Sequence, residues 1–217
     1  MLACSTLAQE PAPPAQKDQS AAEQPKKINE RPTPSPTPAP EPFDGASVVQ
    51  MAEQCVTLET EAGAIQIEML PEAAPETVRN FLNLAATGAF ETTTFSRIVK
   101  GFVIQGGNLA TGEKWTLELA QRAVRTIPDE PSYVKHVRGI VSMARPDKPN
   151  SATTSFFILV GDGPHLDGKF SAFGRVVSGM EVADEINRAP TDGEKPSKPV
   201  RITRALAAPC AKAAPKE

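Results

Sequence analysis

Apolar and polar residues alternate along several short stretches of the chain, which is the pattern of half-buried β-strands. The first stretch covers residues 55–70 and is interrupted by the turn sequence Glu61-Ala-Gly63, so it predicts a hairpin. Ile65 and Ile67 then lie on one face of its second strand. Further strand-like stretches, each mixing large apolar with small polar residues, are residues 95–108, 139–145 and 150–158.

Two other stretches repeat apolar residues at the spacing of an amphipathic helix. The first begins at Pro75 and ends at Gly88, and the second covers Met180–Asn187. Residues 115–124 fit either a short helix or an irregular loop. Short strands, glycine-marked turns and two amphipathic helices together predict an antiparallel barrel whose open ends are covered by the helices.

The N-terminal part of the chain has a different composition. Ten of the 22 prolines fall in the first 42 positions, where large apolar residues are almost absent. Such a segment buries too little apolar surface to offset the entropy of ordering its backbone. We therefore expect residues 1–45 to form a disordered, proline-rich tether, residues 49–210 to form the folded domain and residues 211–217 to form a disordered tail. The alternative for the prolines is a ligand for a proline-recognising partner.

Charge narrows the range of partners. The net charge is −3, the sequence pI is about 5.6, and lysines and arginines are spread along the chain without a cluster. We therefore expect no nucleic-acid partner. No window of 18 apolar residues exists that would cross a membrane. Two histidines, without a cysteine close to them in sequence, predict neither a metal site nor a cofactor.

The stretch from Phe95 to Asn108, FSRIVKGFVIQGGN, places Arg97 and Gln105 among large apolar residues. A guanidinium is seldom buried without a partner. One interpretation is a surface strand whose arginine faces water. The other is a functional arginine, and it is favoured by two further segments that mix apolar and small polar residues, GIVSMAR and SATTSFFILV.

These segments, followed by HLDGKFSAFGRVVSGMEV, occur in the order and at about the spacing of the cyclophilin-type peptidyl-prolyl cis-trans isomerases, which the chain resembles from about Cys55 to Ala208. The resemblance implies a mainly β fold, a closed eight-stranded antiparallel barrel capped by two α-helices. It also implies an enzyme that acts, without a cofactor, on Xaa-Pro bonds of proline-containing polypeptides. We expect the protein to be a monomer.

The resemblance further implies roles for individual residues. Arg97 would stabilise the twisted amide, and Gln105 would orient Arg97. The backbone of Ala144 and Arg145 would pair with an extended substrate. The remaining positions that would contact substrate are Phe102, Val103, Ser155, Phe157, His165 and Leu166. The alternatives are ordinary core packing for the apolar residues and an exposed loop position for His165.

Three positions depart from the family pattern. Ser155 stands where most relatives have glutamine, Phe170 replaces a frequent histidine, and Val103 replaces a frequent methionine. None of these changes removes the arginine or the apolar pocket, so we expect activity. Two other functions stay open: a non-catalytic chaperone or scaffold that binds proline-containing peptides, and a small-ligand barrel of the lipocalin kind, which the four motifs disfavour.

The three cysteines bear on location. Cys4 lies in Leu2-Ala-Cys-Ser5, which resembles the end of a bacterial lipoprotein signal and predicts a lipid anchor at Cys4 as the one membrane contact. The family fold would bring Cys55 and Cys210 together on neighbouring terminal strands. A disulfide there would indicate an extracytoplasmic location, periplasm or cell envelope. The alternative is two free thiols near strand ends.

Overall fold

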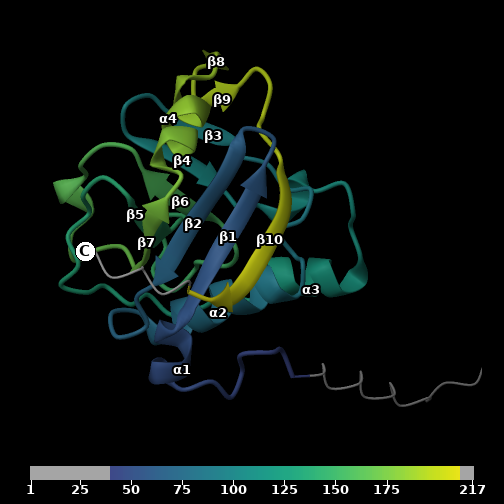
Figure 1. Cartoon of the computed structure of the whole chain (residues 1–217), viewed down its shortest axis with the longest axis vertical. Coiled ribbons are helices and arrows are strands. Elements are labelled where there is room, and N and C mark those ends of the chain that lie inside the picture. Colours follow the sequence, from purple (N-terminus) through teal and green to yellow (C-terminus); the bar gives the residue numbers. More distant parts are fainter. Residues whose placement is uncertain (1–39, 211–217) are drawn as a thin grey trace, which may run out of the picture. The chain divides into compact units, whose positions relative to one another are not determined.

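The computed structural model of the chain describes residues 40–210. Figure 1 shows one curled sheet with helices at its two ends and a small hairpin beside one of them. The helices are α1 (Val48–Ala52), α2 (Pro75–Ala86), α3 (Leu117–Val124) and α4 (Met180–Arg188), with 3₁₀ turns at Leu109–Thr111 and Pro164–Leu166. The strands are β1 (Gln54–Thr60), β2 (Gly63–Met69), β3 (Arg97–Val99), β4 (Val103–Gly106), β5 (Ile140–Met143), β6 (Phe156–Leu159), β7 (Ala172–Ser178), β8 (Thr191–Asp192), β9 (Lys195–Pro196) and β10 (Ile202–Pro209).

The sheet contains eight strands in the order β10-β1-β2-β7-β5-β6-β4-β3, and all of its pairs are antiparallel. Its two edges meet through the residues that precede β3. Thr94 and Arg201 form an isolated bridge, and the Ile202 amide donates to the Thr93 carbonyl at 2.8 Å. The eight strands that we expected are therefore present in a curled half-barrel, whereas a full ladder between β3 and β10 is not formed in the described residues.

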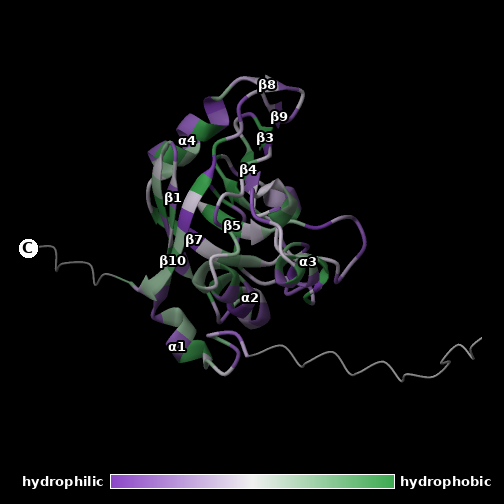
Figure 2. Ribbon diagram, turned by 90° about the vertical axis from the view of Figure 1, so that its right-hand side faces the viewer, coloured by the Kyte–Doolittle hydropathy of each residue, from purple (hydrophilic) through white to green (hydrophobic). Residues whose placement is uncertain are grey.

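The interior of the curled sheet is filled by aromatic and aliphatic side chains. Five phenylalanines there have no exposed surface, and their rings lie 4.8–6.2 Å apart in tilted or edge-to-face pairs. Such geometries are favourable beyond the area that the rings bury. We call this cluster the interior core; its phenylalanines are Phe81, Phe90, Phe95, Phe156 and Phe173. Figure 2 shows hydrophobic colour along the central strands and both colours side by side on α3 and α4.

The helices α2 and α4 lie at opposite ends of the sheet (Figures 1 and 2). The first begins with Pro75 in its first turn and ends just before Gly88, which has a φ of +72°. The second buries Ala183 and Ile186. Both predicted helices are thus confirmed within one or two residues.

Residues 115–124 contain the helix α3, so the short-helix interpretation is right and the irregular loop is wrong. The Thr116 hydroxyl accepts a hydrogen bond from the Leu119 amide at 3.3 Å and caps the helix. Arg122 is buried beneath α3, where it bonds Asn80 Oδ1 at 2.7 Å and Glu41 Oε1 at 2.9 Å.

Glu41 belongs to a segment that we expected to be part of the tether. Residues 40–45 instead contact the domain: the Phe43 amide donates to Asn83 Oδ1 at 2.7 Å, and Arg79 donates to the Phe43 carbonyl at 2.8 Å. The helix α1 follows, with Ser47 and Gln50 forming a capping box. Residues 40–45 are therefore packed against the domain and are not a free part of the tether. The rest of the expected tether, residues 1–39, and the expected tail, residues 211–217, lie outside the described residues.

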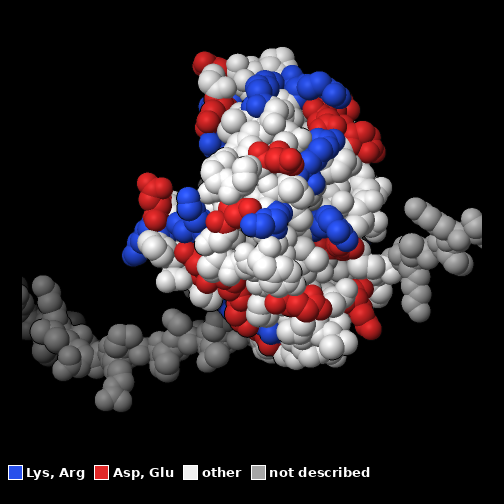
Figure 3. All heavy atoms as spheres, turned by 90° about the vertical axis from the view of Figure 1, so that its left-hand side faces the viewer, with Lys and Arg blue, Asp and Glu red and all other residues white. Residues whose placement is uncertain are grey.

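Cys55 and Cys210 form a disulfide at the end of the β1–β10 pair, with their Cα atoms 4.8 Å apart. This is the pairing that the family resemblance implied. On the face drawn in Figure 3, basic and acidic side chains are interspersed. No helix in residues 40–210 has both the length and the apolar character that a membrane span requires.

Candidate active site

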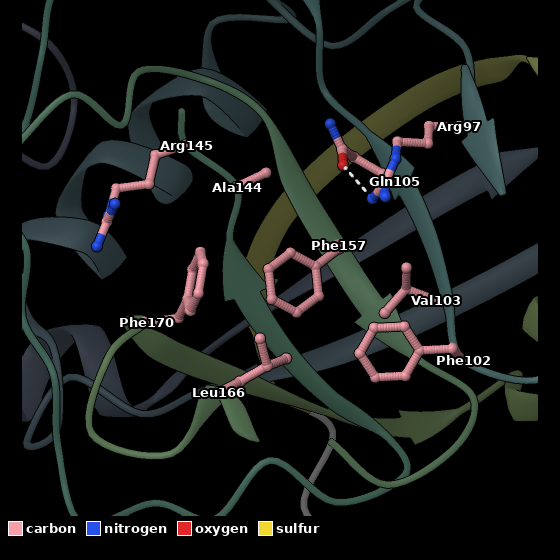
Figure 4. Close-up of a pocket in the computed structure, with 9 residues that line it drawn as sticks. All are labelled: Arg97, Phe102, Val103, Gln105, Ala144, Arg145, Phe157, Leu166 and Phe170. Carbon is pink, nitrogen blue, oxygen red and sulfur yellow. Dashed lines mark hydrogen bonds between the residues drawn. The ribbon is translucent and has the colours of Figure 1, made fainter. Parts of the chain in front are cut away.

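A cavity of about 210 Å³ opens on the outer side of β4, β5 and β6 (Figure 4). Its lining is mostly apolar, and it carries a polar pair at one rim. Its residues are Arg97, Phe102, Val103, Gln105, Ala144, Arg145, Phe157, Leu166 and Phe170. Eight of these nine residues are among the ten that we predicted to act on or bind substrate.

The floor of the cavity results from strand alternation. Successive side chains of a strand point to opposite faces, so β4 directs Ile104 to the interior core and Val103 to the cavity. In the same way β6 directs Phe156 inward and Phe157 outward. The outward residues form a second apolar group, the pocket cluster, made of Val103, Ile140, Phe157, Leu159, Leu166 and Ala172.

The polar rim lies on the β3–β4 pair. Arg97 and Gln105 are directly opposite in the antiparallel register, and Arg97 Nη1 donates to Gln105 Oε1 at 3.3 Å (Figure 4). The side chain of Arg97 is 44% exposed, so the guanidinium is neither buried in the core nor free in solvent. It therefore stands where it can donate to a group that enters the cavity.

Arg145 and Phe170 form the opposite wall of the cavity (Figure 4). The Arg145 guanidinium lies 5.1 Å from the Phe170 ring centroid, which is a cation–π geometry. Asp129 holds Arg145 Nε at 3.1 Å, and the Pro146 and Lys169 carbonyls accept from its terminal nitrogens at 2.9 and 3.3 Å. The sequence showed Phe170 as a departure from the family, but not that it lines the cavity.

Ser155 lies in a second, adjoining cavity of about 460 Å³, which shares Arg97, Gln105, Ala144 and Arg145 with the first. The new lining residues there are Pro146, Ser151, Thr153 and Ser155. A bound chain that places one side chain in the first cavity would reach this second cavity with a neighbouring residue.

Two predicted contacts are placed differently. His165 is exposed and lines neither cavity, although its ring centroid is 5.3 Å from that of Phe102. It therefore occupies the exposed loop position of the alternative interpretation, next to the Phe102 ring. The Ala144 amide is occupied, because it donates to the Ser155 carbonyl at 2.9 Å, and so it does not offer this N–H to a substrate strand.

A chain of polar side chains runs from the buried Ser142 and His136 to the partly exposed Asp167. The His136 ring places Nδ1 3.2 Å from Asp167 Oδ1 and Nε2 3.2 Å from the Ser142 hydroxyl, which in turn donates to the Ser171 carbonyl at 2.8 Å. Burial lowers the pKa of His136, while the Asp167 carboxylate partly opposes that shift. The backbone amide of His136 is the main cause that lowers the pKa of Asp167 to about 2.

The order Ser142–His136–Asp167 is that of a hydrolase triad, but the hydroxyl cannot act as a nucleophile on a substrate. Ser142 has no exposed surface, and it lies opposite Phe157 in the β5–β6 pair. The chain therefore links β5 to the segments around His136, Asp167 and Ser171 by buried hydrogen bonds. Within residues 40–210, no three His, Cys, Asp or Glu side chains gather closely enough to hold a metal ion.

Comparison with known proteins identifies this arrangement. The model of the cyclophilin type peptidyl-prolyl cis-trans isomerase family matches residues 55–207. Peptidyl-prolyl cis-trans isomerase cypE of Dictyostelium discoideum is 40% identical over 159 residues, which are 72% of this chain and 99% of that protein. Isomerase CYP23 of Arabidopsis thaliana is 40% identical over 141 residues, and the match covers 64% of this chain and 62% of that protein.

Solved structures agree with the sequence relatives. A cyclophilin-type isomerase of Cryptosporidium parvum superposes with a TM-score of 0.64 at 30% identity, covering 73% of this chain and 99% of that one. The same kind of protein crystallised in the presence of the dipeptide Ala-Pro gives a TM-score of 0.62 at 31% identity, covering 70% and 97% of the two chains.

Proposed function

The chain belongs to the cyclophilin-type peptidyl-prolyl cis-trans isomerases, and from that premise we propose that Arg97 accelerates rotation about Xaa-Pro bonds over the cavity described above. The observation that carries this proposal is the position of the Arg97–Gln105 pair at the rim of an apolar cavity. A cyclophilin-type isomerase crystallised with Ala-Pro supports a proline-containing ligand for this kind of domain. The proline ring would occupy the floor formed by Phe102, Phe157 and Leu166.

The chemistry needs no bond to be made or broken. Amide resonance gives the peptide C–N bond its double-bond character and a rotation barrier of about 18–20 kcal/mol. In the twisted amide this resonance is lost, and the nitrogen lone pair becomes a hydrogen-bond acceptor. Arg97 would donate to that nitrogen or hold the carbonyl of the residue before proline.

One charged donor accounts for part of the acceleration. A hydrogen bond to a charged group contributes about 1.5–3 kcal/mol, and about 1.4 kcal/mol corresponds to a tenfold change in rate. Arg97 alone would therefore supply roughly 10- to 100-fold. The apolar floor would add to this acceleration. It excludes water, and fixed dipoles interact more strongly with the twisted amide in a site without water.

The test measures cis-to-trans isomerisation of a short Ala-Pro peptide by the full chain and by Arg97→Ala. We expect kcat/KM to fall by tenfold or more while the unfolding midpoint stays within experimental error. Arg204→Ala is the matched control, since Arg204 is an exposed arginine on β10 that lines neither cavity. Wild-type activity in Arg97→Ala would contradict the role of Arg97.

A second candidate function is a binding module that captures proline-containing segments without turnover. The observation in its favour is Ser155, which stands in the second cavity where most relatives have the longer glutamine. A wild-type chain that binds Ala-Pro peptides but isomerises them no faster than buffer would establish this alternative.

The surroundings of the domain are also proposals. The Cys55–Cys210 disulfide supports an oxidising, extracytoplasmic location, and the sequence at Cys4 supports a lipid anchor, with residues 1–39 as the tether. The Thr94–Arg201 bridge supports a barrel closed by loop contacts rather than by a full ladder. We further propose a monomer without a nucleic-acid partner. Membrane fractionation of the natural host protein and of Cys4→Ser tests the anchor: loss of membrane association in the variant supports it.

A further inference from the structure

A carboxylate from outside the family motifs contacts the proposed catalytic arginine. Glu194 lies in the loop of the hairpin formed by β8 and β9. Its Oε2 is 2.7 Å from Arg97 Nε and its Oε1 is 3.2 Å from Arg97 Nη2. This is a bidentate arrangement on one edge of the guanidinium, the geometry in which an arginine–carboxylate pair is most directional.

The hairpin is held beside β3 by its own backbone. The Ile98 amide, directly after Arg97, donates to the Glu194 carbonyl at 2.7 Å. Thr191 pairs with Pro196 and Asp192 with Lys195, and the turn contains Gly193 at a φ of +58°. The backbone of Glu194 is therefore held next to Arg97 by main-chain hydrogen bonds. This position keeps the carboxylate close to the guanidinium.

Glu194 and Gln105 bind different nitrogens of the same guanidinium. Gln105 accepts from Nη1, whereas Glu194 accepts from Nε and Nη2. Each terminal nitrogen carries a second N–H that these bonds, the ones found among the described residues, do not use. The two partners thus fix the plane of the guanidinium and leave N–H groups at the rim of the cavity for a bound amide.

The pair is poorly placed to stabilise the fold. The side chains of Arg97 and Glu194 are 44% and 55% exposed, and exposed ion pairs contribute little to folding free energy. What the bidentate contact determines is the orientation of the guanidinium. Orientation matters for the rate because a misplaced donor weakens binding of the transition state more than it weakens binding of the substrate.

We propose that Glu194 is a positioning residue for isomerisation: it clamps Arg97 against Gln105 so that the free N–H groups point at the twisted Xaa-Pro amide. This inference rests on the role of Arg97 proposed above. It extends the active site to the β8–β9 hairpin, which lies outside the four sequence motifs.

The first test compares Glu194→Gln and Glu194→Ala with wild type on an Ala-Pro peptide. Glutamine keeps one acceptor but loses the charge and the bidentate contact, whereas alanine loses all three. We expect kcat to fall about threefold in Glu194→Gln and about tenfold in Glu194→Ala, with KM and the unfolding midpoint nearly unchanged. Asp192→Asn is the control, since it removes a carboxylate from the same hairpin that makes no ion pair among the described residues.

A second measurement asks whether Glu194 acts through Arg97. In an Arg97→Lys background, where no bidentate contact can form, the further change Glu194→Gln should leave kcat unaltered. The ¹⁵N-labelled Nε–H signal of Arg97 should be slow to exchange in wild type and exchange-broadened in Glu194→Gln. A full additive loss in the double variant would show that Glu194 acts elsewhere and would overturn the proposal.

The outcomes separate this inference from the function itself. If Arg97→Ala is inactive while Glu194→Gln keeps the wild-type kcat, the isomerase stands and the clamp is wrong. If Glu194→Gln is faster than wild type, Glu194 holds Arg97 away from the substrate, which also overturns the clamp. If Arg97→Ala keeps wild-type activity, the role of Arg97 fails first.

Discussion

The interior core and the pocket cluster are built on the same strands from the same kinds of residue, yet they have opposite tasks. Phe156 and Phe157 are adjacent on β6; the first has no exposed surface among the other interior phenylalanines, and the second is 6% exposed on the cavity floor. The interior rings contact each other, whereas the pocket rings contact His165, Arg145 and each other at the rim. The difference between Phe156 and Phe157 therefore lies in their neighbours: only Phe157 faces a cavity that is bordered by polar side chains.

Alanine substitutions of the adjacent residues Phe156 and Phe157 on β6 are expected to give the largest effects. Phe156→Ala should lower the free energy of unfolding by about 3–5 kcal/mol, because it removes a fully buried ring from the interior core and leaves a cavity there. Phe157→Ala should cost less stability and lower kcat/KM by more than tenfold, because it opens the pocket floor. Urea unfolding and the peptide assay at a temperature where both variants are folded measure the two quantities. If the two variants lost the same stability and had the same activity, the interior core and the pocket cluster would not differ in their tasks.

Removal of the disulfide should change the stability of the fold without changing the pocket. It links residues 155 positions apart, and neither cysteine lines a cavity. The double variant Cys55→Ala/Cys210→Ala should lose about 2–5 kcal/mol of unfolding free energy. Its kcat/KM at low temperature should stay at the wild-type value. A matching loss of activity in the folded variant would mean that the β1–β10 edge controls the pocket.

The fold was largely predictable, because periodicity is a local property that a sequence displays directly. The hairpin at residues 55–70, the helices α2 and α4 and the β3–β4 segment each follow from their spacing of apolar residues. The start of the domain was not predictable in this way. Residues 40–45 show no periodic pattern, and they are held by Phe43 packing against the interior core and by hydrogen bonds to Arg79 and Asn83, partners some forty positions away.

The candidate site was predictable for a different reason. The resemblance supplied Arg97, Gln105 and the floor, which strand alternation then placed on one side. Phe170 was visible as an unusual residue, but only the fold shows that it faces Arg145. Glu194 had no signal at all, since an exposed Glu in an Asp-Gly-Glu-Lys turn is ordinary. Its meaning depends on a contact between residues 97 positions apart.

The hydrogen-bonded pair His136 and Asp167 predicts how stability depends on pH. Burial lowers the pKa of His136 in the folded state, so the unfolded chain takes up its proton first as the pH falls. The contribution of neutral His136 is therefore complete above its ordinary pKa of 6.5 and is lost progressively below it. One proton limits the slope to about 1.4 kcal/mol per pH unit. Asp167 adds a separate loss from its ordinary value of 3.8 down to about 2.

Unfolding free energies of wild type and His136→Gln, measured from pH 8 to pH 5, test the first part. The variant is expected to be less stable at neutral pH but to show a flatter profile between pH 7 and pH 5. Lys135 and His165 also lie near Asp167 or His136, so Lys135→Gln serves as the control for surface charge. An unchanged slope in His136→Gln would assign the pH dependence to another group.

The smallest expected effect concerns the pocket side alone. Ser155 lines the second cavity, where its short hydroxyl leaves room for a longer side chain. Ser155→Gln should raise kcat/KM by about two- to tenfold, because a neutral hydrogen bond to the substrate contributes about 0.5–1.5 kcal/mol. The unfolding free energy should not change, since no interior residue is touched. Ser151→Gln, in the same cavity, is the control for bulk. If Ser155→Gln and Ser151→Gln lose activity alike, the second cavity already fits its ligand. Ser155 would then contribute to substrate specificity, and the site would not be a weakened one.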